Sequence, residues 1–239
     1  MNKEKIIITQ DTIKRIIKDV KDINTNKEDF KKNGIFYKHD DENVLKGYIL
    51  IIGPNNTPYQ YGFYFFEILF SYDYPFTPPK VKYFTNDGYT RFNPNLYING
   101  KVCLSILNTW RGEQWTSCQT LRSILLTLVT IFNNEPLTNE PGIKNTHKDF
   151  ENYNKIITYK NLHFSIYQQF LKKSLPENFN IFLDEMNQEY KKNYTKILDL
   201  ISDLYNKNSK EEVIQTGTYS LNCKIDYKLL LDLFKKNEI

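Results

Sequence analysis

The sequence predicts an α+β fold, because helical and strand patterns occupy separate parts of the chain. A one-sided helical pattern covers residues 9–24, four β-rich runs follow between residues 34 and 84, and a second helical pattern comes after residue 116. Strands that follow one another directly, instead of alternating with helices, favour an antiparallel meander. We therefore expect a four-stranded antiparallel sheet with an N-terminal helix and a central helix packed on it.

The composition is that of a folded chain with no strong preference for polyanions. Of the 239 residues, 40% are hydrophobic and 15% are aromatic, which is far from the composition of disordered chains. The formal net charge is only +4, from 32 basic and 28 acidic residues, so no large basic field favours nucleic acid or an anionic membrane. We expect neither as a partner.

Neither a membrane span nor a secretory signal is apparent in the sequence. The chain has no apolar run of about eighteen residues, and Lys3, Glu4 and Lys5 directly precede a run of only three isoleucines at residues 6–8. Cys103, Cys118 and Cys223 are an odd number of cysteines without the paired spacing of a zinc site. We therefore expect no metal and no other cofactor, and a cytoplasmic or nuclear protein with reduced thiols.

The first helix has an apolar side and a basic side. Its apolar positions follow the i, i+3, i+4, i+7 spacing of a helix with one buried side, and they are Ile13, Ile16, Ile17 and Val20. The opposite side carries Lys14, Arg15, Lys18 and Lys21. On periodicity alone this basic side is an ordinary solvated face.

The four strands are expected at residues 35–38, 45–52, 63–70 and 80–84, each bounded by Gly or Pro. The segment Tyr74-Pro75-Phe76-Thr77-Pro78-Pro79 cannot continue a strand, because its three prolines lack amide donors and force the preceding residues into extended conformations. It predicts a stiff loop, which is also a candidate for a cis peptide bond.

Residues 91–110 lack helix or strand periodicity and are rich in turn formers, among them Asn93-Pro94-Asn95 and Asn99-Gly100. A long irregular stretch inside a compact domain is usually functional. Cys103 lies within it, although a Cys between Val102 and Leu104, taken alone, fits a buried structural thiol.

The central helix and the tail complete the expected fold. Thr116 and Gln119 form a capping-box pattern that begins the central helix, which ends near Asn133-Asn134. Helices are then expected over residues 148–173 and 180–206, with a last short helix opened by Asp226. We expect a core at residues 1–173 and a helical C-terminal extension, residues 174–239, docked on that core.

The order and spacing of several motifs resemble the ubiquitin-conjugating enzyme family. These motifs are Pro75-Phe76-Thr77-Pro78-Pro79-Lys80-Val81, then Asn93-Pro94-Asn95, then Cys103 eight residues later, then Trp115. Residues 91–97, 100–110 and 139–142, with Asp226-Tyr227 before Leu229-Leu230, look like the large Z-type members. The resemblance implies the ubiquitin-conjugating fold over nearly the whole chain.

The resemblance also implies an activity. Cys103 would carry ubiquitin or a ubiquitin-like protein as a thioester, accepted from an activating enzyme and passed to a lysine or to a ubiquitin ligase. A thiol suits this task, because it accepts an acyl group from another thioester with little change in free energy. Cys118 and Cys223 match no catalytic position of the family, and we interpret them as structural.

The resemblance assigns further residues to the transfer step. Asn95 would stabilise the oxyanion that forms on the thioester carbonyl, although a role in bracing the turn is equally open. The acidic groups that guide the lysine correspond to Ser105 and Glu140, and since Ser105 carries no charge, activation of the amine depends on Glu140, on Asn95 or on an acid from a partner.

The binding surfaces follow from the same resemblance. Lys14, Arg15 and Lys18 would dock the activating enzyme, and the alternative is a solvated helix face. Phe76 would contact ligases, the alternative being a half-buried packing residue. The companion loop, Trp115 to Ser117, lacks the usual proline because Ser117 takes its place.

Two other function classes stay open at this point. One is a catalytically silent ubiquitin-binding variant of the same fold, against which the presence of Cys103 argues. The other is a cysteine hydrolase with a Cys-His pair, for which His39, His147 and His163 are the available histidines.

Overall fold

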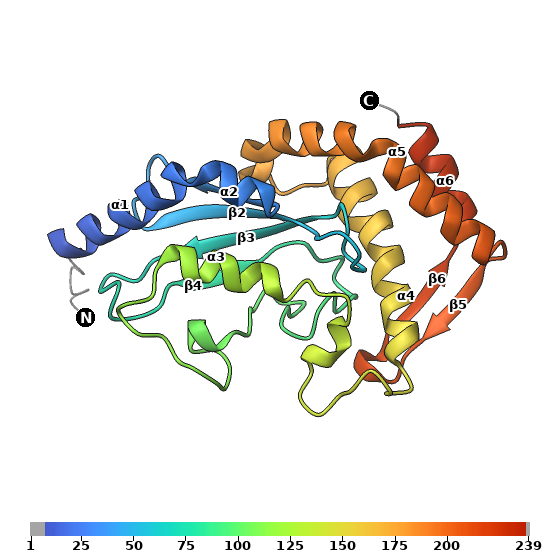
Figure 1. Cartoon of the computed structure of the whole chain (residues 1–239), viewed down its shortest axis with the longest axis horizontal. Coiled ribbons are helices and arrows are strands. Elements are labelled where there is room, and N and C mark those ends of the chain that lie inside the picture. The colour runs from blue at the N-terminus through green and yellow to red at the C-terminus, as the bar shows by residue number, and fades with distance from the viewer. Residues whose placement is uncertain (1–7, 238–239) are drawn as a thin grey trace, which may run out of the picture.

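The computed structural model describes residues 8–237, and its centre is a four-stranded antiparallel sheet (Figure 1). The strands are β1 (Ile35–His39), β2 (Lys46–Ile52), β3 (Phe63–Leu69) and β4 (Lys80–Tyr83). They pair in sequence order, β1-β2-β3-β4, with registers such as Ile49 opposite Phe66. The predicted meander is confirmed. The isoleucines at residues 6 and 7 lie outside the described residues.

Two helices precede the sheet, α1 (Gln10–Thr25) and α2 (Lys27–Lys32). The side chain of Thr9 caps α1 by accepting a hydrogen bond from the Thr12 amide. The buried side of α1 consists of Thr12, Ile16, Asp19 and Ile23. The prediction that Ile17 belongs to the buried side is wrong, because the helix is rotated toward Asp19 and Ile17 is 55% exposed.

The central helix is α3 (Leu121–Thr130), and its N-cap, Thr120, lies four residues later than the predicted cap at Thr116. Its capping box joins Thr120 and Ser123, whose side chains and backbone amides hydrogen-bond reciprocally. The predicted cap residues interact in another way, since the side chain of Gln119 accepts a hydrogen bond from the Thr116 amide at 3.1 Å. That contact closes a turn before the helix.

The sheet is covered on both faces. On one face, Phe132, just after α3, packs against Tyr64 and Phe66 of β3, with ring centroids 4.5 and 6.3 Å apart. On the other face, Phe63 contacts Phe170 at 5.2 Å and Phe65 contacts Phe179 at 5.0 Å. This double cover explains why β2 and β3 are apolar along almost their whole length instead of alternating.

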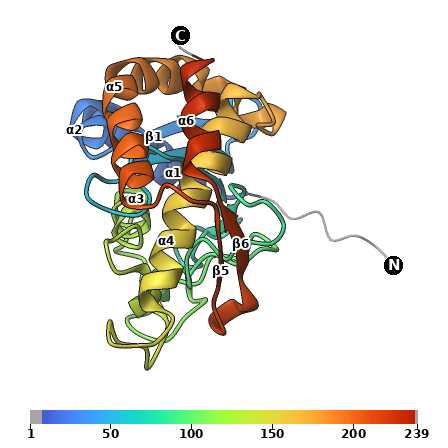
Figure 2. The same cartoon turned by 90° about the vertical axis from the view of Figure 1, so that its right-hand side faces the viewer.

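The second cover comes from the helical part after residue 149 (Figure 2). It consists of α4 (Phe150–Lys160), a continuous π-helix (Asn161–Leu171), a 3-10 segment (Glu177–Phe182), α5 (Leu183–Lys207) and α6 (Tyr227–Lys235). The predicted helical extension is confirmed, and Asp226 caps α6 as expected. The division of the chain at residue 173 stays a prediction.

The extension also contains a β-hairpin, which the sequence pattern did not indicate. Its strands are β5 (Glu212–Gln215) and β6 (Asn222–Ile225), and Figure 2 shows the hairpin beside α4. Short 3-10 turns lie at Ser105–Leu107, Pro136–Asn139 and Thr218–Ser220. Within residues 8–237, no helix is both long enough and apolar enough to cross a bilayer.

Candidate active site

Cys103 follows a tight turn that brings two parts of the irregular loop together. Leu96 and Val102 form an isolated antiparallel bridge across this turn. Gly100 makes the turn possible, because its φ is +88° and a Cβ atom there would lie 2.9 Å from the carbonyl oxygen of Tyr83. The turn therefore places Cys103 opposite Asn95.

Two hydrogen bonds join Asn95 and Cys103. The Cys103 amide donates to the Asn95 carbonyl oxygen at 2.9 Å, and the Asn95 side-chain Nδ2 donates to the Cys103 carbonyl oxygen at 2.7 Å. In this state the Asn95 amide braces the turn, which is one of the two roles expected for it. The same group is a neutral donor beside the residue that the sequence proposes as nucleophile.

Thr109 fixes the chain on both sides of Cys103. Its hydroxyl donates to the Val102 carbonyl oxygen at 2.8 Å and accepts from the Leu104 amide at 2.9 Å. The loop after the cysteine is therefore folded back on the residues that flank it. This bracing fixes the backbone of Cys103 without using its sulfur.

The cysteines differ in exposure. Cys103 is only 1% exposed and Cys223 is also buried, whereas Cys118 is exposed on the loop before α3. The structural interpretation therefore fits Cys223 but is wrong for Cys118. None of the described histidines pairs with Cys103: His39 hydrogen-bonds Tyr37, His147 accepts from the Asp149 amide, and His163 stacks on Tyr159.

Asn93 supports the loop that carries Asn95 and Cys103 from the core. It is fully buried, and its Nδ2 donates to the Tyr59 hydroxyl at 2.9 Å and to the Ile131 carbonyl oxygen at 2.8 Å. Its Oδ1 accepts from the Asn95 amide at 2.9 Å. Because these bonds satisfy the side chain inside the protein, Asn93 has a structural role.

Arg91, which was not among the predicted site residues, holds the same loop from the outside. It donates to the carbonyl oxygens of Asn93 and Pro94. Its guanidinium lies 3.4 Å from the ring centroid of Tyr97 and 5.0 Å from that of Tyr219, which belongs to the hairpin of the extension.

Glu140 lies on the other side of Tyr219 and accepts a hydrogen bond from its hydroxyl. Within residues 8–237, no hydrogen bond joins Glu140 directly to Cys103 or Asn95, so the link runs through Tyr219 and Arg91. Ser105 begins the 3-10 turn directly after the cysteine loop and packs near Gly112. No sequence pattern predicts that Tyr219 contacts Glu140, because the two residues are 79 positions apart in the chain.

The three basic residues expected to dock an activating enzyme have different environments. Lys14 is 76% exposed at the side chain, and Lys18 is also exposed. Arg15 instead forms an ion pair with Asp19 at 3.1 Å and donates to the carbonyl oxygens of Ser117 and Gln119. Lys14, which forms a solvent-exposed ion pair with Asp11 at 4.0 Å, and Lys18 are accessible to a partner. Arg15 joins α1 to the loop before α3.

The residues expected to contact ligases form one surface around a buried anchor. Phe76 is 80% exposed, which excludes the half-buried packing role, and Ser117 is exposed. Trp115 is only 7% exposed, and its indole nitrogen donates to the Pro75 carbonyl oxygen at 2.7 Å. Trp115 therefore joins the two exposed loops. The Tyr74-Pro75 peptide bond is cis.

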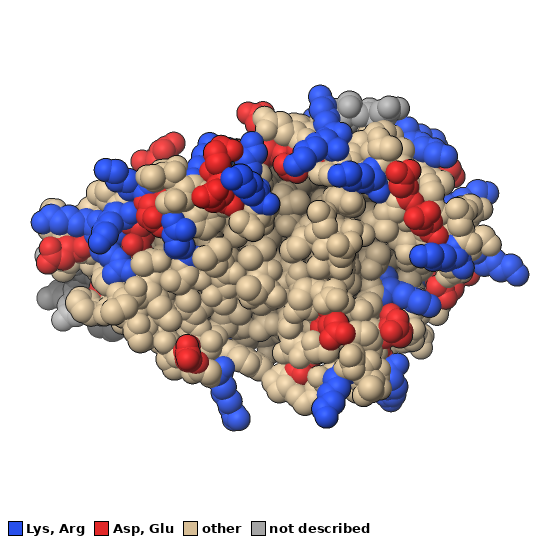
Figure 3. All heavy atoms as spheres, in the orientation of Figure 1, with Lys and Arg blue, Asp and Glu red and all other residues tan. Residues whose placement is uncertain are grey.

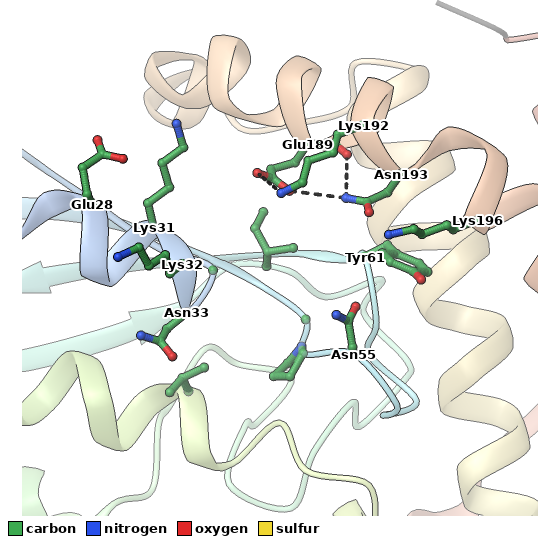
Figure 4. A pocket seen from close by; sticks show the side chains of 15 residues that line it. Glu28, Lys31, Lys32, Asn33, Asn55, Tyr61, Glu189, Lys192, Asn193 and Lys196 are labelled. Atoms are coloured by element: carbon green, nitrogen blue, oxygen red, sulfur yellow. Dashed lines mark hydrogen bonds and ion pairs between the residues drawn. The ribbon is translucent and has the colours of Figure 1, made fainter.

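The face that carries α3 is largely free of charged side chains, whereas basic and acidic side chains together gather along the edge formed by α1, α2 and α5 (Figure 3). A pocket of about 540 Å³ lies at this edge, between α2, the β2–β3 connection and α5 (Figure 4). Lys31, Lys32, Lys192 and Lys196 contribute to its lining, and neither Cys103 nor Glu140 does. The pocket is therefore separate from the candidate active site.

A comparison with protein families identifies this arrangement. The family model described as ubiquitin-conjugating enzyme matches residues 15–162, which include the sheet, the Cys103 loop and Glu140. The chain belongs to the ubiquitin-conjugating enzyme family. The family and fold predicted from the motifs are thereby confirmed.

Within the ubiquitin-conjugating enzymes, the chain is similar to Z-type members. It is 37% identical to the ubiquitin-conjugating enzyme E2 Z of Xenopus tropicalis over 161 residues, which cover 66% of this chain and 51% of that protein. It is 40% identical to the human E2 Z over 136 residues, 56% of this chain and 38% of the relative. The predicted Z-type resemblance is confirmed.

A third relative is much larger. The human protein named dual E2 ubiquitin-conjugating enzyme/E3 ubiquitin-protein ligase BIRC6 is 46% identical over 118 residues, 46% of this chain and 2% of that protein. The chain thus spans about half the length of the Xenopus relative, and less of the others.

Proposed function

We propose that this protein accepts ubiquitin, or a ubiquitin-like protein, from an activating enzyme as a thioester on Cys103 and passes it to a substrate lysine or to a ligase. The observation that carries the proposal is the pairing of Cys103 with Asn95 across a braced turn, in a chain of the ubiquitin-conjugating enzyme family. This pairing sets a nucleophile beside a neutral hydrogen-bond donor.

Charging is an exchange of one thioester for another. The Cys103 thiolate attacks the carbonyl carbon of the modifier's thioester on the activating enzyme, and the bond to the first sulfur breaks to release a thiolate. Because Cys103 is only 1% exposed, the residues around its sulfur must move before charging. Docking of the activating enzyme on the side of α1 that carries Lys14 and Lys18 would supply binding energy for that movement.

Transfer requires the substrate lysine amine in its neutral, deprotonated form. A lysine has a reference pKa of about 10.4, so only about one in a thousand is uncharged near neutrality. Attack on the thioester then places an oxyanion on the carbonyl, which Asn95 stabilises after its amide leaves the Cys103 carbonyl oxygen. The amine nitrogen forms the new bond to the carbonyl carbon, and the Cys103 sulfur leaves as a thiolate. The proton that the nitrogen then loses balances the thiolate, which returns to the thiol.

The roles of Asn95 can be separated by replacing it. We expect Asn95→Ala to slow transfer to lysine by about a hundredfold, the usual loss for one oxyanion donor. Charging and transfer are measured separately, together with the thermal midpoint. If the charging rate falls as much as the transfer rate and the thermal midpoint also falls, Asn95 only braces the turn.

A charging assay tests the proposal as a whole. The protein is incubated with activating enzyme, ATP and ubiquitin or a ubiquitin-like modifier, and adducts are detected on non-reducing gels. We expect a thiol-sensitive adduct that disappears in Cys103→Ala and becomes a thiol-resistant ester in Cys103→Ser. Cys118→Ser is the matched control and should charge normally.

Two other outcomes would replace the proposal. If no activating enzyme yields the adduct although the protein is folded and binds ubiquitin, it is a catalytically silent binding variant, an outcome that the burial of Cys103 favours. If a ubiquitin ester is hydrolysed with no activating enzyme present, it is a cysteine hydrolase.

We also infer where and with what the protein acts. Its three cysteines are free thiols, which suits a reducing cytoplasm or nucleus.

Exposed Phe76 and Ser117, held together by Trp115, offer a surface for ligases. Phe76→Ala should reduce ligase-dependent transfer and leave charging intact, and loss of charging would contradict this assignment.

A further inference from the structure

The hairpin of the C-terminal extension reaches the candidate active site through one side chain. Tyr219, in the turn between β5 and β6, donates its hydroxyl hydrogen bond to Glu140. Burial raises the pKa of Tyr219, and the hydrogen bond to Glu140 raises it further, so the hydroxyl stays protonated and remains a donor. The carboxylate expected to guide lysine is therefore held by the extension.

The same tyrosine ring also faces the loop that carries Asn95. Its centroid lies 5.0 Å from the guanidinium of Arg91, which hydrogen-bonds the backbone of Asn93 and Pro94. Tyr153 of α4 closes this group, because its hydroxyl donates to the Arg91 carbonyl oxygen at 2.7 Å and its ring lies 6.0 Å from that of Tyr219. Tyr219 thus contacts Glu140 and the support of the Asn95 turn together.

The turn that presents Tyr219 is held in an unfavourable backbone conformation. Tyr219 and Ser220 have φ values of 61° and 49°, in the left-handed region that residues with a Cβ atom rarely adopt. Buried Asp149 holds this turn, because its Oδ2 accepts from the Thr218 amide at 2.7 Å and from the Thr218 hydroxyl at 2.8 Å. Such strain persists only where surrounding contacts enforce it.

We propose that Tyr219 is a positioning residue for transfer to lysine, acting through Glu140 and Arg91. This inference rests on the proposed function. The Tyr219 hydroxyl occupies one carboxylate oxygen of Glu140 and leaves the other oxygen to accept a hydrogen bond from the incoming lysine. The extension thereby helps to form the part of the site that receives the substrate lysine.

The test separates charging from transfer. The protein is charged on Cys103, the activating enzyme is stopped by removing ATP, and loss of the thioester is followed at increasing concentrations of free lysine. We expect Tyr219→Phe to charge normally but to discharge about tenfold more slowly at saturating lysine, because a hydrogen bond to a charged group is lost. Tyr219→Ala, which also removes the ring beside Arg91, should be slower still.

The matched control is Tyr205→Phe, which removes one tyrosine hydroxyl from α5 of the same extension and should discharge at the wild-type rate. A readout specific to positioning is the double variant with Glu140→Gln. If Tyr219 acts through Glu140, adding Tyr219→Phe to Glu140→Gln causes no further loss, whereas independent effects would multiply. A cooperative thermal transition of Tyr219→Phe should show that the variant is folded, because the ring and its contact with Arg91 remain.

Each outcome decides a different point. Normal discharge by charged Tyr219→Phe overturns the role of Tyr219 and leaves the proposed function intact. Faster discharge overturns it as well, because Tyr219 would then restrain Glu140. Multiplying losses in the double variant also contradict the inference, and failure of the wild-type protein to charge overturns the proposed function itself.

Discussion

At the scale of single residues, burial separates the cysteines of this protein. Cys103 is 1% exposed behind a loop braced by Thr109, whereas Cys118 lies exposed just before α3. Cys223 is buried in β6, and burial raises the pKa of its thiol. Reaction of a thiol with a small electrophile requires both access and the thiolate form, so these residues should differ in reactivity.

We therefore expect an alkylating reagent to modify Cys118 in the uncharged protein before either buried thiol, Cys103 or Cys223. Mass spectrometry of the peptides after timed labelling measures the order. Cys118→Ser should remove the fast phase and leave the slower ones unchanged. Equal labelling rates for Cys118 and Cys103 would contradict the burial of Cys103 in the uncharged protein.

At the scale of elements, one buried carboxylate joins three segments. Asp19 of α1 is 4% exposed and binds Arg15, the hydroxyl of Tyr74 in the proline-rich loop, and the amide of Leu121 at the start of α3. Burial raises the pKa of Tyr74, and the hydrogen bond that its hydroxyl donates to Asp19 raises that pKa further. The exposed loops on either side of Trp115 thus depend on α1 for their position.

Asp19→Ala should lower the free energy of unfolding by about 3–5 kcal/mol, because it leaves the buried donors of Tyr74 and Leu121 unpaired and Arg15 without its carboxylate. Urea unfolding measures the change. Lys21→Ala, an exposed change on the same helix, should stay within about 0.5 kcal/mol of wild type. Similar losses in both variants would show that Asp19 has no special role.

At the scale of the whole molecule, the extension completes the core instead of merely adjoining it. Phe179 is fully buried, and its ring contacts Tyr48, Phe65 and Phe84 on the sheet face opposite α3. The sheet would expose these aromatic side chains to water without that cover. Unfolding of the extension and of the sheet should therefore be one cooperative event.

Phe179→Ala should cost about 3–5 kcal/mol of unfolding free energy, the range for deleting a buried aromatic ring. The neighbouring Ile181, which is 42% exposed, provides the control, and Ile181→Ala should cost far less. Thermal unfolding is followed by tryptophan fluorescence and by circular dichroism. Separate transitions for the two signals would argue against a shared core.

His163, which stacks on Tyr159 in the helical part that covers the sheet, makes the free energy of unfolding depend on pH. Burial lowers the pKa of His163 below 6.5 and Lys160 lowers it further, whereas Asp87 opposes the shift. The neutral form is thus favoured in the folded state, so its stabilising contribution is complete above about pH 6.5 and is lost as the pH falls toward the lower folded pKa. His163→Phe keeps a ring between Tyr159 and Tyr167.

We expect the urea midpoint of the wild-type protein to fall between about pH 7 and pH 5.5, a range in which ordinary carboxylates stay charged. His163→Phe should lose less stability over that range. The pH dependence that remains in His163→Phe comes in part from His39, because burial lowers the pKa of His39 as well. Identical pH dependence in wild type and His163→Phe would exclude this role.

The order of the strands could be predicted from local patterns, and some details could not. Ile17 follows the apolar spacing of α1 but is exposed, because the helix turns Asp19 inward to meet partners more than fifty residues away. The hairpin at β5 and β6 was missed because its strands have only four residues each, and β6 alternates buried and exposed positions over too short a length to exclude other structures.

The sequence by itself determined the meander, the helices around it and the place of Cys103 in the same turn-rich loop as Asn95. These features depend on apolar periodicity, on Gly and Pro, and on motifs that are local in the chain. Only the tertiary structure decided that Arg15 braces a loop, that Cys103 is buried and that Tyr219 holds Glu140. Such contacts join side chains that are far apart in sequence, and folding energy, not spacing, selects which of them meet.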